Sequence, residues 1–472
     1  MTTTINNEHK ELNFSSEREQ SQACLNSAEH EKNQGRKVLN VPNKREQNQT
    51  CLDSAEREGL NPKGNVPNLR FPEFRGKWEE HKLEDITAEI GDGIHATPIY
   101  DDNGTFYFVN GNNISEYGIT ITATTQKVTE EEALRNNASA LNSYSILLSI
   151  NGTVGNVALY KNEPIMLGKS ACYINVSSNI NRNYIFYYLM MPKCQFYFTS
   201  ELTGTTIKNL SLKSIRKTKV LLPNANEQSR IARLFDAINE RIATQNKIIE
   251  DLKKLKSAII EKVFCSPNKK NPMCRIEGFE QALSTYKMCD FSSRIATKNK
   301  DSKCSLVLTI AAQYGLVNQE SFFNKSVASE NLTGYYLLHK GEFAYNRSYS
   351  AGYDWGAVKR LDNYDEGVLS SLYICFKINE TIVDSDYLAY YFESTKWHRG
   401  LSDIAGEGAR NHGLLNVSIT DYFNTKHRFP VIEEQKAIAK MLNTITEKER
   451  KATLLGECYQ KQKQYLLRQM FI

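Results

Sequence analysis

The chain has 472 residues, of which 40% are hydrophobic and 24% are charged. A domain commonly has about 150 residues, so this length predicts about three structural units. The hydrophobic share is enough for buried cores and excludes a chain that is disordered throughout. The sequence has no apolar run of about 18 residues, and residues 1–10 are polar, so we expect neither a membrane-spanning helix nor a secretory signal.

Cysteine usage indicates a cytoplasmic protein, and the charge distribution bears on possible partners. The ten cysteines form no Cys-x-x-Cys pair and no Cys/His cluster at zinc spacing, which is typical of reduced thiols. The net charge is +5, but residues 77–222 hold 13 Lys and Arg against 14 Asp and Glu, and residues 280–429 hold 16 against 17. The basic excess lies in residues 223–279 and 430–472, so composition permits a nucleic-acid partner without requiring one.

Residues 1–66 differ in composition from the rest of the chain. They are rich in Asn, Gln, Glu and Lys and contain almost no aromatic residue, so we predict a disordered polar extension. Part of the segment is duplicated, because Arg18-Glu19-Gln20 returns as Arg45-Glu46-Gln47. A duplicated polar tail is favoured over a tandem binding tag, and the segment carries no recognisable chemistry.

The informative repeat is longer. Residues 223–264 align with residues 430–471 at a constant offset of 207 without a gap, and 11 of the 42 positions are identical. Chance rarely produces an ungapped match of that length, so the two halves of the chain are predicted to be copies of one unit.

Both copies are predicted to be long helices. Pro223 and Pro430 stand just upstream, where a missing N–H is harmless, and Glu227 and Glu434 suit the positive end of the helix dipole. Apolar residues follow at steps of three or four, typical of a coiled-coil seam. The expected seam comprises Ile231, Phe235, Ile238, Ile242, Gln245, Ile249, Leu252, Leu255 and Ile259 in the first copy and Ile438, Leu442, Ile445, Ala452, Leu455, Tyr459, Gln462 and Leu466 in the second.

A helix of about 40 residues would be about 60 Å long, too long for one globular domain. A solvated amphipathic pair would explain the charged outer faces of these helices, but not two equal copies. The segments before them, residues 77–222 and 280–429, are rich in Gly, Asn and Tyr and predict short strands joined by turns. The expected strands include residues 145–150, 154–160, 305–310 and 372–378, and the expected local helices are residues 184–190 and 387–392.

A search for catalytic motifs finds no credible active site or metal site. Gly168-Lys169-Ser170 resembles the end of a phosphate-binding loop, but Glu163 occupies the position of its first glycine. No Gly-x-Gly-x-x-Gly occurs, and the absence of any Pro-Pro pair excludes the Asn/Asp-Pro-Pro-aromatic loop of amino-methyltransferases. No two histidines stand at helical metal-ligand spacing.

Polar loops in both halves are suited to nucleic-acid binding. Glycine lets the backbone approach a phosphate, Lys and Arg neutralise it, and Asn or Arg can bind base edges. Each loop alone could be an ordinary turn, but their recurrence in both halves favours a binding surface. The candidates are Asn110, Asn112, Asn113, Asn151, Thr205, Thr206, Lys208 and Asn209 in the first half and Asn346, Arg347, Tyr349, Arg410, Asn411 and His412 in the second.

Residues 67–472 resemble the specificity subunit of type I restriction-modification systems. The markers are residues 66–74 with Trp78, the Pro-(x)3-Glu-Gln-x-x-Ile-Ala motif at residues 223–232 and 430–439, and the alternation of variable domain and helix. The segment before the second variable domain, at Glu277-Gly278-Phe279, is a weaker match. Residues 1–66 lie outside the resemblance.

The resemblance implies an α+β fold with a pseudo-twofold internal repeat, in which two β-rich target recognition domains are separated by two long antiparallel coiled-coil helices. The domains would be residues 67–222 and 280–429, the spacer helices 223–264 and 430–472, and the linker 265–279. Seam packing is assigned above all to Ile231, Ile238, Ile242, Ile249, Leu252, Ile438, Leu442, Ile445, Leu455 and Leu466.

The resemblance also implies the function. Each recognition domain would read one half of an asymmetric bipartite sequence in double-stranded DNA, and the helices would set the gap, with half-sites about 34 Å apart on one face of the duplex. Two methyltransferase subunits would bind S-adenosylmethionine, and restriction-translocase subunits would use ATP and Mg²⁺. The chain itself would bind no cofactor. Two alternatives stay open: a coiled-coil scaffold whose β-rich domains bind protein or glycan, and a silent specificity cassette.

Overall fold

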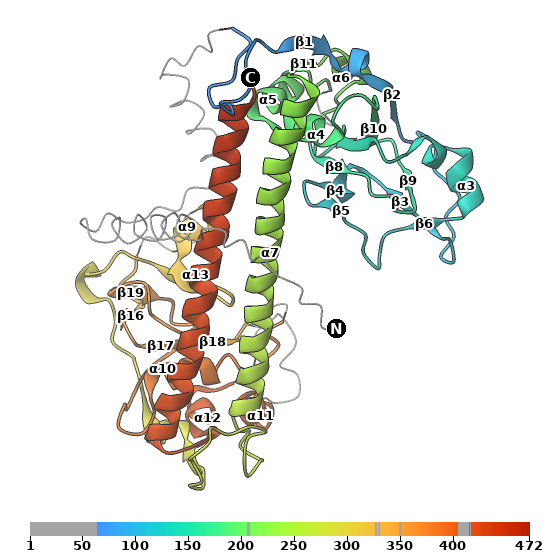
Figure 1. Ribbon diagram of the computed structural model, residues 1–472. Coiled ribbons are helices and arrows are strands. Elements are labelled where there is room, and N and C mark those ends of the chain that lie inside the picture. The colour runs from blue at the N-terminus through green and yellow to red at the C-terminus, as the bar shows by residue number, and fades with distance from the viewer. Residues whose placement is uncertain are drawn as a thin grey trace, which may run out of the picture. The chain divides into compact units, whose positions relative to one another are not determined.

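The computed structural model describes residues 64–204, 208–325, 328, 331–348, 352–404, 415 and 417–472. Contacts divide the chain into two compact units (Figure 1). The N-terminal unit comprises described residues from 64–245 together with 455–472, and the C-terminal unit comprises described residues from 246–454. This division cuts through both long helices.

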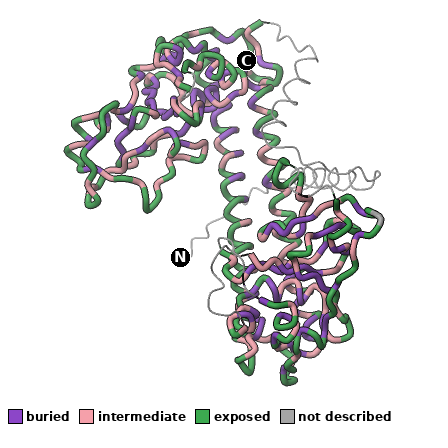
Figure 2. The backbone as a smooth tube through the Cα atoms, turned by 180° about the vertical axis from the view of Figure 1, so that it is seen from behind, coloured by how far each residue is buried: buried purple, intermediate pink, exposed green. Residues whose placement is uncertain are grey.

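The two long helices are α7 (Ala225–Val263) and α13 (Ile432–Met470), each of 39 residues. At 1.5 Å per residue each is about 58 Å long. Buried positions recur along both helices, as Figure 2 shows. Of the expected seam residues, the buried ones are Ile231, Phe235, Ile238, Ile242, Gln245, Ile438 and Leu442, and the half-buried ones are Ile249, Leu252, Ile259, Ile445, Ala452, Leu455, Tyr459 and Leu466.

Two expected seam positions are wrong, because Leu255 is 49% exposed and Gln462 is also exposed. The neighbouring Lys256 takes the place between the helices, where its Nζ lies 2.5 Å from Oε2 of Glu449 on α13. An ion pair therefore replaces an apolar contact at this turn. Supercoiled knobs-into-holes packing stays a prediction.

Within each unit the two helices run antiparallel. In the N-terminal unit Phe235, near the start of α7, packs against Phe471 just past the end of α13, with ring centroids 5.6 Å apart. In the C-terminal unit Phe264, just past the end of α7, shares a core with Ile438 and Leu442 near the start of α13. In both units the beginning of one helix thus meets the end of the other.

The last aromatic residue of each long helix is buried in a β-rich domain. Phe471 packs against Tyr184 and Tyr188 of α4 (Arg182–Met190), with centroid distances of 5.3 and 5.8 Å. Its repeat equivalent Phe264 packs against two tyrosines of α10 (Ser385–Tyr391) at 5.0 and 5.7 Å. Burial of large aromatic side chains contributes strongly to a core, so these contacts anchor the helix ends.

Both units share one framework. The N-terminal unit has a four-stranded antiparallel sheet in the order β2-β10-β7-β8, and the C-terminal unit has the order β13-β20-β17-β18. A two-stranded sheet, β1-β11 or β12-β21, leads into each long helix. The framework strands are β1 (Glu79–Lys82), β2 (Thr87–Asp92), β7 (Ser145–Ser149), β8 (Val157–Leu159), β10 (Ala171–Val176), β11 (Lys219–Leu222), β12 (Ser284–Lys287), β13 (Ser292–Arg294), β17 (Phe343–Asn346), β18 (Ala357–Arg360), β20 (Ile374–Ile378) and β21 (Lys426–Phe429).

Short helices complete the framework around these strands. They are η1 (Leu83–Ile86), α5 (Pro192–Ser200) and α6 (Leu212–Arg216) in the N-terminal unit and α8 (Met288–Phe291), α11 (His398–Ser402) and α12 (Ile419–Asn424) in the C-terminal unit.

The segments inserted into the frameworks differ. In the N-terminal unit β3 (Phe106–Val109), β6 (Lys127–Val128) and β9 (Ile165–Leu167) form a mixed sheet in which β3 and β9 are parallel. The C-terminal unit instead has two antiparallel pairs, β14-β15 and β16-β19. The remaining elements are η2 (Gly111–Asn113), β4 (Ile114–Ser115), β5 (Gly118–Ile119), α3 (Glu130–Arg135), η3 (Ala138–Ala140), η4 (Lys300–Ser302), β14 (Leu308–Ala311), β15 (Gly315–Asn318), α9 (Gln319–Phe323), β16 (Tyr336–His339) and β19 (Glu366–Leu369).

Most strands expected from the sequence are present, with shifted ends. The expected strand at residues 305–310 starts only at Leu308, because Leu306 accepts a backbone hydrogen bond from Val368 and Val307 forms a parallel bridge with the same residue. Residues 306–307 therefore join a different pairing. The two local helices are confirmed as α4 and α10.

The glutamate of the repeated Pro-(x)3-Glu-Gln motif holds an arginine in each unit. Arg70 donates from Nε and Nη2 to the two carboxylate oxygens of Glu227, both at 2.7 Å. Arg275 binds Glu434 in the same bidentate way at 2.9 and 2.7 Å. Both carboxylates are almost fully buried, so each depends on its arginine for charge compensation.

The glutamine of the motif joins the long helix to the local helix. Gln228 donates to the carbonyl of Pro223 at 2.9 Å and accepts from the backbone N–H of Asn181, the N-cap of α4, at 3.0 Å. Gln435 makes the equivalent bonds at 2.9 Å, to the proline of its own motif and from the N-cap Asp384 of α10. The motif is therefore structural in both copies.

We predict that Arg70→Met and Arg275→Met each lower the free energy of unfolding by about 3 kcal/mol, because each leaves a buried carboxylate unpaired. Chemical denaturation of the purified chain measures this. Arg230→Met is the control, because Arg230 is exposed and its contact with Glu73 is 4.0 Å long. Replacing Arg70 and Glu227 together by Met should recover most of the loss, and equal losses for Arg230→Met and Arg70→Met would contradict the argument.

His427 on β21 is a buried neutral base. Its Nδ1 lies 3.0 Å from the Tyr391 hydroxyl and its Nε2 lies 2.9 Å from the Thr425 hydroxyl. Burial lowers the pKa of His427 to about 3. Unfolding restores an ordinary pKa of about 6.5, so the unfolded chain binds the extra proton between these two values.

Stability should therefore fall as the pH falls from about 6.5 toward about 3, with this residue contributing up to about 1.4 kcal/mol per pH unit. We predict that His427→Gln removes this contribution, so its free energy of unfolding depends less steeply on pH. Denaturation at several pH values measures the slope. The exposed His339 provides the control variant, His339→Gln, which should keep the wild-type slope. An unchanged slope in His427→Gln would contradict the assignment.

Candidate nucleic-acid interface

One end of the framework sheet in the N-terminal unit holds a pocket of about 450 Å³. It lies where β2 ends, where β7 enters its following loop and where β9 turns into β10. Its polar lining consists of Asp92, His95, Asn151, Lys169, Ser170, Asn209 and Ser211. Carboxylate, amide and ammonium groups together match the donors and acceptors of base edges and phosphates.

The structure brings Asn151 and Asn209 together, although 58 positions separate them in the sequence. The two residues form an antiparallel bridge, and Leu210 donates its N–H to the carbonyl of Ile150 at 2.9 Å. Asn151 also donates from Nδ2 to the carbonyl of Lys169 at 3.2 Å. The end of the Gly204–Asn209 loop is thus fixed to the loop that follows β7.

A turn at residues 110–113 lies against the same end of the sheet. The hydroxyl of Ser170 donates to Oδ1 of Asn110 at 2.9 Å and accepts from the N–H of Gly111 at 2.8 Å. The turn passes so close that a Cβ on Gly111 would lie 2.7 Å from the carbonyl oxygen of Ser170. Glycine is therefore required at position 111, because two segments of the backbone approach each other closely there.

The three asparagines of this turn are not equivalent. Asn113 accepts from the N–H of Asn110 at 3.0 Å and donates to the carbonyl of Thr120 at 3.0 Å, so its amide maintains the turn on both sides. Asn112 is exposed at the tip. DNA contact stays a prediction for all three, and Asn112 is the one whose side chain projects into solvent.

The charged groups at the pocket are of both signs. Nε2 of His95 lies 2.8 Å from Oδ2 of Asp92, which makes a polar pair at the rim. Lys169 and Lys208 are exposed, and Lys208 directly precedes the pocket residue Asn209. Local positive charge is therefore present on a domain whose overall charge is nearly neutral, which suits contact with a phosphate backbone.

Cys172 on β10 is paired in the sheet with the pocket residue Asp92 at the end of β2. Burial raises the pKa of the Cys172 thiol, and the carboxylate of Asp92 raises it further. The thiol therefore stays protonated and does not act as a nucleophile.

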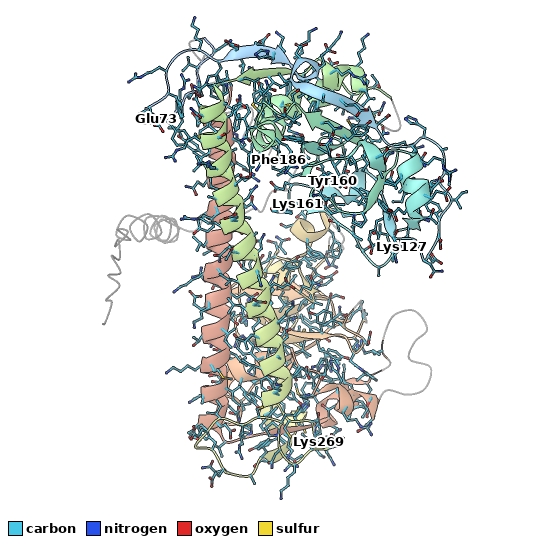
Figure 3. The ribbon with its side chains drawn as sticks, turned by 45° about the vertical axis from the view of Figure 1, so that its right-hand side comes forward. Glu73, Lys127, Tyr160, Lys161, Phe186 and Lys269 are labelled. Carbon is cyan, nitrogen blue, oxygen red and sulfur yellow. The ribbon has the colours of Figure 1, made fainter. Side chains whose placement is uncertain are left out.

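The opposite end of the sheet packs against α4. Tyr160 and Lys161, labelled in Figure 3, follow β8 there. Arg182 of α4 donates to the carbonyl of Tyr160 at 3.0 Å. Because β7 and β8 are antiparallel, Lys161 lies at the sheet end away from Asn151. It is a surface lysine of the same domain outside the candidate interface.

The C-terminal unit has a related arrangement after β17. Asn346 accepts from the N–H of Ser348 at 3.0 Å in a local turn. Arg347 donates to the carbonyls of Val417 and Leu372, each at 3.1 Å, and its own carbonyl accepts from Leu415 at 3.0 Å. These bonds hold the approach to α12 against the end of β17. They give Arg347 a structural role, while its contact with DNA stays a prediction.

Six of the candidates lie outside the described residues. They are Thr205, Thr206, Tyr349, Arg410, Asn411 and His412.

Asp92, His95 and Lys169 are not among the residues expected from the sequence to bind nucleic acid. Lys169 belongs to the rejected phosphate-loop match Gly168-Lys169-Ser170, which forms the turn between β9 and β10. Its position between two buried strands was the available signal, because a turn between such strands lies at one end of the sheet. Only the strand order shows that the same end also carries Asn151.

Comparison with known proteins supports the resemblance. The family model described as the type I restriction modification DNA specificity domain matches residues 75–254, which cover the first β-rich domain and most of α7. The putative type I restriction enzyme MjaX specificity subunit of Methanocaldococcus jannaschii is 24% identical over 408 residues, 81% of this chain and 90% of that protein. The MjaVIII specificity subunit of the same organism is 25% identical over 283 residues, 56% of this chain and 63% of that relative.

A solved structure shows the same fold. The crystal structure of the type I restriction-modification S subunit from M. genitalium superimposes with a TM-score of 0.50 at 15% identity, over 86% of this chain and 99% of that one. Mixed helix and sheet in two repeated units is therefore the architecture of a known fold.

Within the part of the chain that the structure describes, no helix combines the length and the apolar character needed to cross a bilayer. The matched domain is one of DNA recognition and not of catalysis, and the relatives are named as specificity subunits. Over residues 75–254 the chain is accordingly similar to the non-catalytic DNA specificity domain of type I restriction-modification systems, and a relative that matches most of the chain is named as a specificity subunit.

Proposed function

We propose that this chain recognises an asymmetric bipartite sequence in double-stranded DNA and directs methyltransferase and restriction subunits to it. The observation that carries this proposal is the pair of equal frameworks with unequal inserts. Strand order β2-β10-β7-β8 is repeated as β13-β20-β17-β18, whereas the inserted sheets differ in strand number and direction.

Equal frameworks with different inserts suit two half-sites of different sequence. A protein that bound the same sequence twice would need two equal surfaces, as symmetric dimers have at palindromic sites. The N-terminal unit presents the pocket with Asn151 and Lys169, whereas the equivalent strand end in the C-terminal unit carries Asn346 and Arg347. The two surfaces therefore offer different groups to base edges.

Catalysis belongs to the partners. Two methyltransferase subunits would supply the S-adenosylmethionine site, and restriction-translocase subunits would bind ATP and Mg²⁺. The repeated framework supports two copies of one partner, because each copy would meet an equivalent surface. The chain itself supplies recognition and spacing.

A scaffold that binds protein or glycan remains the second candidate, and the near-neutral charge of the two β-rich segments favours it. Residues 77–222 hold 13 basic against 14 acidic residues, so the domain as a whole does not attract DNA. A silent specificity cassette is the third candidate. Methylation mapping and a salt titration of DNA binding separate these functions.

We predict that deleting the gene removes one asymmetric bipartite methyladenine motif from the genome of the source organism. Long-read methylation mapping of the intact and deleted strains measures this. Reintroducing the gene should restore the motif. A palindromic motif would contradict asymmetry, and an unchanged map would favour the scaffold or the silent cassette.

We predict that Lys169→Gln and Lys208→Gln each reduce by about one the slope of log affinity against log salt for DNA, because each removes one phosphate contact. The measurement is a salt titration of DNA binding by the chain assembled with its methyltransferase. Lys161→Gln is the matched control at the opposite end of the sheet and should leave the slope unchanged. Equal slopes in all four proteins would place phosphate binding elsewhere.

A further inference from the structure

Lys463 of α13 is a buried lysine with a partner in a distant part of the sequence. Its side chain is only 3% exposed, and its Nζ lies 2.5 Å from Oε2 of Glu116. Both residues belong to the N-terminal unit. Lysine is almost never buried to this extent unless it is paired, so this contact fixes the lysine and the segment that carries Glu116.

Glu116 stands at the tip of the hairpin formed by β4 and β5. The register pairs Ile114 with Ile119 and Ser115 with Gly118, which leaves Glu116 and Tyr117 as the turn. The tip makes a second bond to α13, because Gln460 donates from Nε2 to the Tyr117 hydroxyl at 2.8 Å.

The two bonds reach one face of the helix. Gln460 and Lys463 are three residues apart on α13, so their side chains lie on the same side. Two contacts to one face of α13 define the orientation of the β4-β5 hairpin relative to this helix, which a single contact would not do.

The hairpin continues directly from the turn at the candidate interface. Asn113, the last residue of that turn, precedes β4 and donates to the carbonyl of Thr120 just after β5 at 3.0 Å. Asn156, in the loop after β7, donates to the carbonyl of Ile114 at 3.0 Å. A fixed hairpin therefore holds the turn at residues 110–113 and the loop after β7 at a defined angle to α13.

The other repeat uses the same lysine differently. Lys256 is the equivalent of Lys463 at the offset of 207, and it binds Glu449 of α13. In the C-terminal unit this lysine thus joins helix to helix, whereas in the N-terminal unit it joins helix to insert. The contact of Lys463 follows from the insert and is not a general requirement of the helix repeat.

We propose that Glu116 and Lys463, with Tyr117 and Gln460, fix the first recognition domain on α13 and so restrict the spacer length that the protein accepts between half-sites. This inference rests on the proposed bipartite recognition. One added base pair moves a half-site by about 3.4 Å and turns it by about a tenth of a turn. A domain in a fixed orientation rejects that displacement, and a domain that swivels tolerates it. Both residues are positioning residues, which act through the turn at residues 110–113.

The test uses the assembled methyltransferase and a set of DNA targets with the native half-sites and spacers one base pair shorter, native, or one base pair longer. The variants are Lys463→Met and Glu116→Gln. The first removes the buried cation, and the second keeps the shape of the side chain while removing its charge. Lys461→Met is the matched control, because Lys461 is exposed on the same helix two residues away and is likewise a repeated lysine.

Both variants should keep the two half-site sequences and methylate the altered spacers about tenfold better relative to the native spacer, the scale of a lost coupling between contacting residues. The control should keep the wild-type preference. Exchanging the charges, as Glu116→Lys with Lys463→Glu, should restore part of the preference. A solely structural role would instead lower methylation of all three targets equally.

Unchanged spacer preference in Glu116→Gln, with an unchanged melting temperature, would overturn the inference. So would a change in the recognised bases, because the pair would then act in base recognition. If the wild-type complex methylates no bipartite target, the proposed function fails, and that result is distinct from failure of the spacer effect.

Discussion

The fold depends on a buried carboxylate at the start of each long helix. Glu227 and Glu434 lie in the first turns of α7 and α13, at the positive end of each helix dipole, and each is held by an arginine from the segment that leads into its domain. A buried charge permits few alternative arrangements, because every displacement leaves it unpaired. The direction in which each helix leaves its domain is therefore fixed by chemistry that both copies share.

The far ends of the helices follow a different principle. Phe264 and Phe471 enter aromatic clusters on α10 and α4, where area and ring geometry stabilise the contact without charge. Each long helix thus has a polar anchor at its start and an apolar anchor at its end. Neither the arginine–glutamate pairs at the helix starts nor the aromatic contacts at the helix ends involve an inserted strand. The framework can therefore remain constant while the inserts vary.

The candidate interface shows how far polar residue types alone can be interpreted. Asn110, Asn113 and Arg347 are residue types that bind bases, but each forms hydrogen bonds within the chain. Loops need internal bonds to be held in place, and the same amide and guanidinium groups provide them. A sequence pattern therefore selects the region of the interface more dependably than the individual side chains that contact DNA.

The sequence by itself determined the repeat, the two long helices and the family resemblance, because helical periodicity and an ungapped duplication are properties of neighbouring residues. It also located the loops at the candidate interface. It did not show that Leu255 is exposed beside an ion pair, or that Asn151 meets Asn209. The spacing of apolar residues predicts which helix positions are buried, but it contains no information on the partner of a neighbouring lysine such as Lys256.

Tertiary structure alone decided that Lys463 is buried against Glu116, a residue 347 positions earlier in the chain. In the sequence Lys463 and Lys256 are equivalent members of one repeat, and nothing local distinguishes them. Their partners differ because a hairpin inserted into only one framework reaches the helix. Which charge pairs with which is set by the close approach of distant segments, and that information exists only in the folded chain.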